Sequence, residues 1–235
     1  WRGGQAIPAF DFFMAKGVAK SFRKHLASFI NFYVAMENGT QADEKAIRTL
    51  IKEHLPSIKS TEAERETLRI ALVALQIIID KEHLTRIAEK AYQQTKKDTH
   101  QAMEGFIHNL NTMHSRGGNQ VVFSSINYGT DTSAEGRLVI EELLKATIEG
   151  LGTRGEVPVF PIQIFKVKDG VSYSEKDFEK AMKAENIEDA MRGTYEAPNF
   201  DLLLRACQTT SKALFPNFMF LDTPFNKNEK WKADD

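Results

Sequence analysis

The segment Gln120–Tyr128 carries the side chains best suited to bind a ligand. Its residues are β-branched, aromatic or polar, which predicts a strand, and the polar ones gather toward its carboxyl end. The hydroxyls of Ser124 and Ser125 and the amide of Asn127 can hydrogen-bond a sugar or a phosphate. The same groups can instead satisfy backbone groups of the adjoining loop. Strand alternation places Ser125 and Asn127 on one face and Ser124 on the other, and the residues alone leave both interpretations open.

Three side chains on the preceding segment have metal-ligand chemistry at helical spacing. His100, Glu104 and His108 are four residues apart, so they line one stripe of a helix. Lys96 and Lys97 share this polar region, and no further ligand is evident. We therefore favour a solvated helix face over a metal site.

Two other candidates also have structural interpretations. Cys207, the only cysteine, lies in a mostly apolar helical neighbourhood, which favours a small core residue over a nucleophile. Gly117 and Gly118 precede a strand, whereas a phosphate-cradling loop leads into a helix. We favour a tight turn there, although Arg116 and the glycines can also touch an anion. These patterns give no catalytic residue and no metal ligand.

The segments around these candidates divide the chain into a mainly helical part, residues 1–116, and a part in which strands alternate with helices, residues 117–235. Apolar residues at helical spacing predict four helices in the first part: Pro8–Gly39, Asp43–Leu55, Thr61–Ile79 and Ala91–His114. In the second part we expect strands at Gln120–Tyr128 and Val159–Val167, and helices at 132–151, 175–190 and 200–214. Capping boxes are expected at Thr61/Glu64 and at Thr132/Glu135.

The order strand, helix, strand, helix predicts a mixed, helix-rich α/β fold. Two or three strands do not make an independent sheet of this type. Either helices cover both faces of the sheet, or sequence outside this segment supplies the neighbouring strands.

The amino-acid composition argues against several classes of protein. The chain has 235 residues, of which 42% are hydrophobic, so a sizeable core is feasible, and this fraction together with the modest net charge of −1 argues against a disordered chain. Its 31 basic and 32 acidic residues are interspersed, which argues against a nucleic-acid partner. The longest apolar run, Ile70–Ile79, is far shorter than the roughly 20 residues of a membrane span, so we expect no membrane partner. The cysteine usage fits a reducing compartment, and we expect a cytoplasmic protein.

Several long stretches form an ordered set of motifs. The most distinctive is Asn109–Thr132, NLNTMHSRGGNQVVFSSINYGTDT, followed by Val159–Gly170, VFPIQIFKVKDG. Shorter stretches follow the same order: Gly3–Asp11, Gly150–Gly152, Pro198–Asp201 and Leu214–Phe218. This set resembles the anaerobic (class III) ribonucleoside-triphosphate reductases over nearly the whole chain, with Thr40–Glu89 the least distinctive part.

The resemblance implies a glycyl-radical enzyme that reduces ribonucleoside triphosphates at the 2′ carbon for DNA synthesis. The implied fold is part of a ten-stranded α/β barrel of the pyruvate formate-lyase type. For the full enzyme it implies a C-terminal glycyl radical, formate as reductant and a C-terminal zinc site. The implied partners are the ribonucleoside triphosphate, nucleotide effectors, an iron–sulfur activase that uses S-adenosylmethionine, and a second copy in a homodimer.

The family's reactive groups fall outside this segment. Its thiyl-radical cysteine lies in a Gly-Cys-Arg loop downstream of the Leu214–Phe218 match, and a second active-site cysteine lies upstream of Gly3–Asp11. Cys207 matches a helix before that loop, so it should not inherit the radical role. We therefore expect residues 1–235 to be a partial catalytic domain that is inactive alone and holds no cofactor of its own.

Substrate contact is the role that the resemblance carries over to this segment. Ser124, Ser125 and Asn127 lie on a barrel strand whose end the family places near the nucleotide, and His114 and Arg116 lead into that strand.

A hypothesis of a different class is a non-catalytic helical interaction or regulatory module. The polar end of the strand Gln120–Tyr128 distinguishes the interaction module from the reductase segment. In the module this end needs no ligand, whereas in the reductase segment it should face a concave pocket. For the reductase segment we also expect self-association through unpaired sheet edges or through the helical face.

Overall fold

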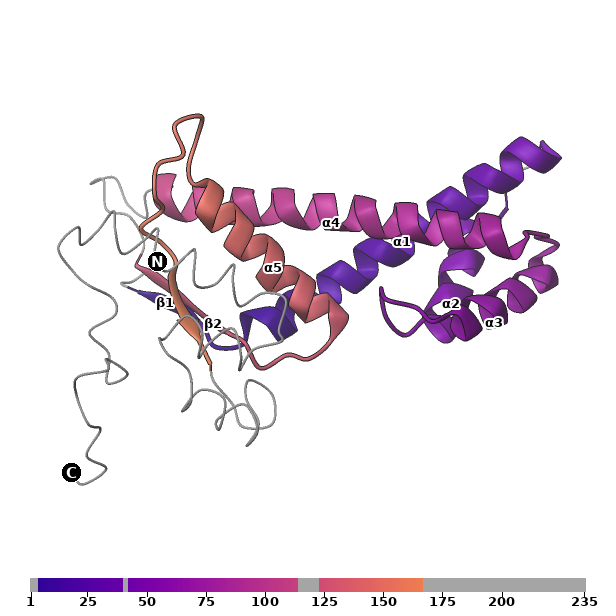
Figure 1. Ribbon diagram of the computed structural model, residues 1–235, viewed down its shortest axis with the longest axis horizontal. Helices are drawn as coiled ribbons and strands as arrows, with labels where there is room; N and C mark the ends of the chain where they lie inside the picture. The colour runs from indigo at the N-terminus through magenta and orange to yellow at the C-terminus, as the bar shows by residue number, and fades with distance from the viewer. Residues whose placement is uncertain (1–3, 40–41, 114–122, 167–235) are drawn as a thin grey trace, which may run out of the picture. The chain divides into compact units, whose positions relative to one another are not determined.

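The computed structural model describes residues 4–39, 42–113 and 123–166 (Figure 1). Its helices and strands, in chain order, are β1 (Gln5–Ile7), α1 (Phe10–Asn38), α2 (Glu44–His54), α3 (Glu62–Leu72), the 3₁₀ helix η1 (Val73–Leu75), α4 (Lys81–Thr112), β2 (Ser124–Tyr128), α5 (Ala134–Glu149) and β3 (Ile162–Phe165). The chain divides into two compact units. Among the described residues, the sheet unit comprises 4–11, 103–113, 123–132 and 140–166, and the helical unit comprises 12–39, 42–102 and 133–139.

The sheet unit contains three parallel strands in the order β1-β2-β3. Figure 1 shows β1 and β2 side by side although more than a hundred residues separate them. In register, Ser125 lies opposite Ala6 of β1 and Ile162 of β3. The expectation of a helix-rich α/β fold is confirmed. The sequence did not predict β1, because three residues are too few to show strand alternation.

The helical unit is built on buried stripes. On α1, the apolar residues Val18, Phe22, Leu26, Ile30 and Val34 recur every fourth position and are buried. Gly17 does not break this helix, which ends before Gly39, a glycine with a positive φ of 67° whose N–H bonds the carbonyl of Ala35.

Side-chain caps begin both short helices, and the one on α3 was predicted from its sequence. Asp43 caps α2 by accepting a hydrogen bond from the N–H of Lys45 at 2.9 Å. Thr61 and Glu64 form the expected capping box of α3. These caps fix the starts of both helices, while Leu68 and Leu72 of α3 are fully buried.

Two expectations about helix ends are wrong. Ser133, rather than Thr132, caps α5, because its Oγ accepts from the N–H of Gly136 at 3.0 Å. The carboxylate of Glu135 instead accepts from the N–H of Ile58 at 2.8 Å, so a tertiary contact replaces the predicted capping box. The helix expected to run to Ile79 ends at Leu72 and continues as η1 until Gln76, which adopts a left-handed conformation with a φ of 59°.

The remaining differences concern lengths and burial. Helix α4 begins at Lys81 instead of Ala91. The helical spacing of Met113 predicts a core position, but this side chain is 64% exposed just after the end of the helix. Strand β3 is shorter than the predicted segment Val159–Val167. Cys207, Gly117, Gly118 and the two expected helices at 175–190 and 200–214 lie outside the described residues. Within the described residues, no helix combines the length and apolar character needed to cross a membrane.

Candidate functional site

Strand β2 divides its side chains between two faces of the sheet. Burial alternates along it, with Ser124, Ile126 and Tyr128 buried and Ser125 and Asn127 half-buried. The predicted division of these residues between two faces is therefore confirmed. The register shows which residues of the neighbouring strands share each face.

The face that carries Ser125 and Asn127 is called the open face here. By register it also includes Ala6 of β1 and Ile162 and Ile164 of β3. The two isoleucines are 54% and 43% exposed. Two hydrogen-bonding side chains thus lie beside apolar side chains on an accessible surface.

The opposite, covered face is held by a chain of hydrogen bonds. The hydroxyl of Tyr128 donates to Oε1 of Gln163 at 2.7 Å, and Nε2 of Gln163 donates to Oγ1 of Thr147 at 2.9 Å. Thr147 then donates to the carbonyl of Leu143 at 2.8 Å. This chain of hydrogen bonds ties β2 and β3 to the second half of α5.

Ser124 lies on the covered face, so the structure does not bring it together with Ser125 and Asn127. It is 7% exposed, and within the described part of the chain its Oγ has no hydrogen-bond partner. A buried hydroxyl without a partner costs stability, and it is not placed to share a ligand with the open face.

The carboxyl end of β2 is clamped by Asp11. This side chain is completely buried and accepts hydrogen bonds from the N–H groups of Gly129 at 2.8 Å and Asp131 at 3.1 Å. Gly129 has a positive φ of 117°, and a Cβ there would lie 2.8 Å from both the carbonyl oxygen of Lys166 and the ring of Phe165. Only glycine fits this turn, and Asp11 supplies the acceptor for its N–H.

Two more side chains tie the ends of β3 to the rest of the unit. Asn111 uses its whole amide: its Oδ1 accepts from the N–H groups of Val159 at 2.9 Å and Phe160 at 3.0 Å, and its Nδ2 donates to the carbonyls of Ile107 at 2.7 Å and Phe160 at 2.6 Å. Beyond β3, Nζ of Lys166 donates to the carbonyl of Pro8 at 2.6 Å.

These contacts join the sequence motifs to one another. Asp11 ends the first motif and binds the turn of the Asn109–Thr132 motif. Asn111, near the start of that motif, binds the Val159–Gly170 motif, and Lys166 binds back to the first motif. Local sequence patterns predict no role for any of these three residues, although all three lie in the motifs. Their polar side chains beside turns were the available signal, but their partners lie up to 158 residues away.

Two predicted site residues, His114 and Arg116, lie outside the described residues, so their role stays a prediction. Of the helix stripe considered as a metal site, Glu104 and His108 are exposed, and the ring of His108 lies 3.4 Å from Oγ1 of Thr112 on the next turn.

A cluster of one lysine and two glutamates lies on the second half of α5. Lys145 contacts Glu141 and the buried Glu142, with an Nζ-to-carboxylate distance of 3.1 Å to Glu142. Desolvation by itself lowers the pKa of Lys145, but hydrogen bonds and charge attraction from the two glutamates outweigh it and raise the pKa above its usual value. Lys145 therefore stays charged and neutralises a carboxylate that is 2% exposed.

Comparison with known proteins decides the family. The model of a family described as "Anaerobic ribonucleoside-triphosphate reductase" matches residues 1–235, the whole chain. The chain belongs to this anaerobic ribonucleoside-triphosphate reductase family. The resemblance inferred from the motifs is therefore confirmed.

Curated relatives carry the same name. The anaerobic ribonucleoside-triphosphate reductase of Escherichia coli K12 is 28% identical over 132 residues, which are 56% of this chain and 16% of that protein. The enzyme of that name from phage T4 is 29% identical over 55% of this chain and 18% of its own length, and the one from Haemophilus influenzae is 27% identical over 59% and 16%. The matched region thus spans less than a fifth of each relative.

Proposed function

We propose that this chain is a segment of the catalytic domain of an anaerobic ribonucleoside-triphosphate reductase, and that its open face forms part of the wall that holds the nucleotide. The family match over the whole chain supports the reaction class. The single structural observation behind the proposed site is that Ser125 and Asn127 share one accessible face of a parallel sheet.

The chemistry of the open face suits a ribonucleotide. The amide of Asn127 can donate to and accept from ribose hydroxyls, and the Ser125 hydroxyl can donate to a ribose or phosphate oxygen. Ile162 and Ile164 offer an apolar surface against the sugar or the base. Ligands of parallel α/β sheets bind near the carboxyl ends of the strands, and Asn127 lies one residue from the end of β2.

The arrangement of the strands supports an incomplete barrel wall. The described strands are all parallel, and β1 and β3 each have a neighbour on one side only among the described residues. Their outer edges can therefore pair with further strands, as the ten-stranded barrel implied by the family requires.

The residues of this chain would position the substrate instead of reacting with it. In the family, a cysteine thiyl radical formed from a glycyl radical, with formate as reductant, supplies the reduction at the 2′ carbon. The Asp11 clamp and the Tyr128–Gln163–Thr147 chain would keep the open face rigid while the nucleotide is bound. The zinc site that the resemblance implies at the C-terminus of the full enzyme uses four cysteines. The single cysteine of this chain does not fit such a site, so no step here passes through zinc.

Substrate binding by an Asn127→Ala variant of the intact protein tests the proposed site. Loss of one or two hydrogen bonds to the ribose should raise the Kd of the ribonucleoside triphosphate by about tenfold. Isothermal titration calorimetry under anaerobic conditions measures this constant without requiring turnover.

Ser124→Ala is the matched control, because it removes a hydroxyl from the same strand but from the covered face. It should leave the Kd unchanged. Equal Kd values for Asn127→Ala and the unaltered protein would contradict a substrate role for the open face. An intact protein that binds no ribonucleoside triphosphate would favour the alternative, a non-catalytic helical interaction module.

A further inference from the structure

The helical unit contains a pocket of about 270 Å³, lined by the segment after α2, by α3 and by α4. Two apolar residues of its lining, Ile58 and Ala88, are 4% and 8% exposed. The N–H of Ile58 donates to the carboxylate of Glu135 at 2.8 Å, which holds the segment after α2 in place. At roughly 30 Å³ for each water molecule, the pocket has the volume of about nine waters. Its size therefore suits a small metabolite.

Helix α4 lines the pocket with polar side chains. Thr85, Glu89, Tyr92 and Gln93 lie three or four residues apart, so they share one face of the helix. Within the described part of the chain, these four side chains form no hydrogen bond, and Glu89 forms no ion pair. Their hydrogen-bonding groups are therefore available to a ligand in the pocket.

Arg65 lines the pocket from α3 and uses only part of its guanidinium within the protein. Its Nη1 donates to the carbonyl of Ser60 at 2.5 Å and to the Oγ of Ser60 at 3.2 Å. Its Nε is buried and has no hydrogen-bond partner in the part of the chain that the structure describes, and its Nη2 has none there either. The two contacts with Ser60 thus orient the guanidinium and leave donors unused.

The carboxylates next to Arg65 in sequence are already engaged. Glu62 pairs with Lys81, and Glu64 accepts from the N–H of Thr61 at 2.6 Å in the capping box. Among the described residues, Arg65 forms no ion pair with a carboxylate. A carboxylate of a ligand would supply the counter-charge that this guanidinium lacks.

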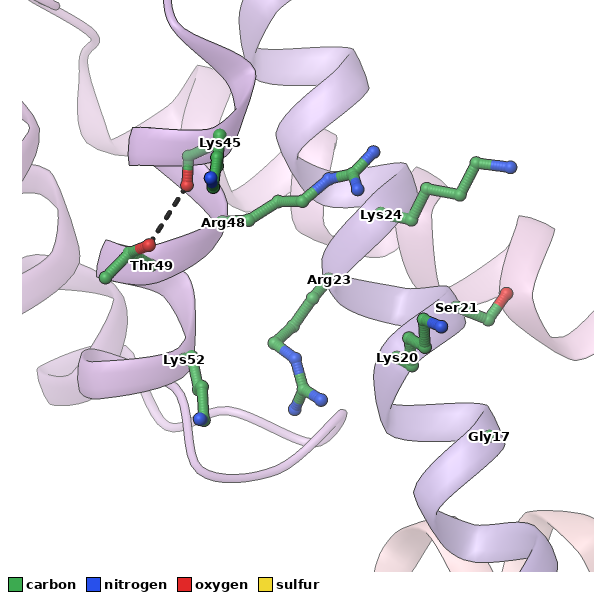
Figure 2. A pocket seen from close by; sticks show the side chains of 9 residues that line it. All are labelled: Gly17, Lys20, Ser21, Arg23, Lys24, Lys45, Arg48, Thr49 and Lys52. Atoms are coloured by element: carbon green, nitrogen blue, oxygen red, sulfur yellow. Dashed lines mark hydrogen bonds between the residues drawn. The ribbon is translucent and has the colours of Figure 1, made fainter.

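The charges of the pocket have both signs. Lys59 and Arg65 line it as cations and Glu89 as an anion, and Glu89 forms no ion pair with either cation. A groove of the same unit, between α1 and α2, differs: Figure 2 shows Arg23 extending from α1 and Arg48 from α2, and no described carboxylate lines it. A lining of cations favours any anion, whereas separated charges of both signs favour a ligand that carries both.

We propose that this pocket binds a small zwitterion, with the carboxylate of the ligand at Arg65 and its ammonium group at Glu89. Guanidinium and carboxylate groups form charge-assisted hydrogen bonds, and an ammonium group donates such bonds to a carboxylate. The hydroxyl of Tyr92 offers a further polar contact, and Ile58 and Ala88 offer an apolar surface to the carbon chain of the ligand. No residue of the open face takes part, so this inference does not rest on the proposed function.

Titration of the intact protein with 4-aminobutyrate tests the proposal, with glycine and 6-aminohexanoate as a shorter and a longer zwitterion. Saturation-transfer difference NMR at low salt should show binding of at least one of the three. The carboxylate of the same length without the ammonium group (acetate, butyrate or hexanoate) should bind at least tenfold more weakly, because it leaves Glu89 without a partner.

Glu89→Gln should raise the Kd of the bound zwitterion about tenfold, because a charge-assisted contact is lost. Glu53→Gln is the matched control, since Glu53 is an exposed glutamate of α2 outside the pocket, and it should leave the Kd unchanged. Glu89→Lys reverses the charge and should reverse the preference, so that the dicarboxylate glutarate binds more tightly than 4-aminobutyrate. This gain of binding requires a folded variant.

Three outcomes would overturn the proposal. They are the absence of binding by all three zwitterions, equal Kd values for a zwitterion and the carboxylate of the same length, and a Kd that Glu89→Gln does not change. Asn127→Ala should not alter binding of the zwitterion, so this inference and the proposed nucleotide wall can fail separately.

Discussion

The sheet unit depends more than the helical unit on buried polar side chains that reach backbone groups far away in sequence, although Glu135 makes such a contact with Ile58 in the helical unit. In the helical unit, buried apolar stripes pack helices whose ends are set by local caps such as Asp43 and Thr61. In the sheet unit, buried polar side chains reach backbone groups far away in sequence, as Asp11 reaches Gly129 across 118 residues. The helical unit can therefore tolerate many surface changes, whereas single polar residues decide the geometry of the sheet.

The long-range hydrogen bonds of the sheet unit matter for the proposed ligand binding. A sheet that presents Ser125 and Asn127 to a ligand must hold its strand ends in fixed positions, and directional hydrogen bonds do this better than apolar contacts. The following predictions test the contrast between the two units, beginning with the largest effect.

Asp11→Ala should destabilise the protein most. It leaves two buried N–H groups without an acceptor, which costs about 3–5 kcal/mol in the free energy of unfolding. Urea titration measures the loss. Asp43→Ala is the control in the helical unit, where an exposed cap is lost at a cost of about 1 kcal/mol. Equal losses for the two variants would remove the proposed contrast.

Replacement of a glycine by alanine should destabilise the sheet unit but stabilise the helical unit. Gly129→Ala places a Cβ 2.8 Å from a backbone oxygen at a φ of 117° and should cost about 2–4 kcal/mol. Gly17→Ala has no atom within 4 Å of the new Cβ and should stabilise α1 by about 0.5–1 kcal/mol. Thermal unfolding of both variants checks the signs. A destabilised Gly17→Ala would show that α1 is packed more tightly there than the structure indicates.

The contrast also explains how much the sequence could predict. Helical periodicity and caps predicted α1, α2 and the start of α3 because these signals lie within a few residues of one another. Strand alternation placed Ser125 and Asn127 on one face for the same reason. The roles of Asp11, Asn111 and Lys166 could not be predicted from local patterns, because each partner is brought close only by the fold. Glu135 shows where prediction from local patterns fails, because its carboxylate binds the N–H of Ile58 and does not form the predicted capping box.

A smaller effect concerns the pH dependence of the helical unit. Asp98 contacts Nε2 of His25 at 2.6 Å. Desolvation by itself raises the pKa of Asp98, but hydrogen bonds from Gln94 and His25 and the charges of His25 and Lys24 lower it more, so it lies below the usual value.

The stability that Asp98 contributes is therefore complete above its unfolded-state pKa of about 3.9, and it is lost as the pH falls through the lower folded-state value. Asp98→Asn should flatten the dependence of the urea midpoint on pH between about pH 5 and pH 2. An unchanged slope would show that other carboxylates account for the acid sensitivity.

The central claim, that the open face of the sheet contacts the nucleotide, is tested most directly by the side-chain amide signals of two asparagines. In ¹⁵N-labelled intact protein titrated with a ribonucleoside triphosphate, the NMR resonance of the Asn127 side-chain amide should shift. That of Asn111, whose amide is fully engaged by the backbone around Phe160, should stay in place. Saturation of the protein with nucleotide while the Asn127 resonance does not move would contradict the account.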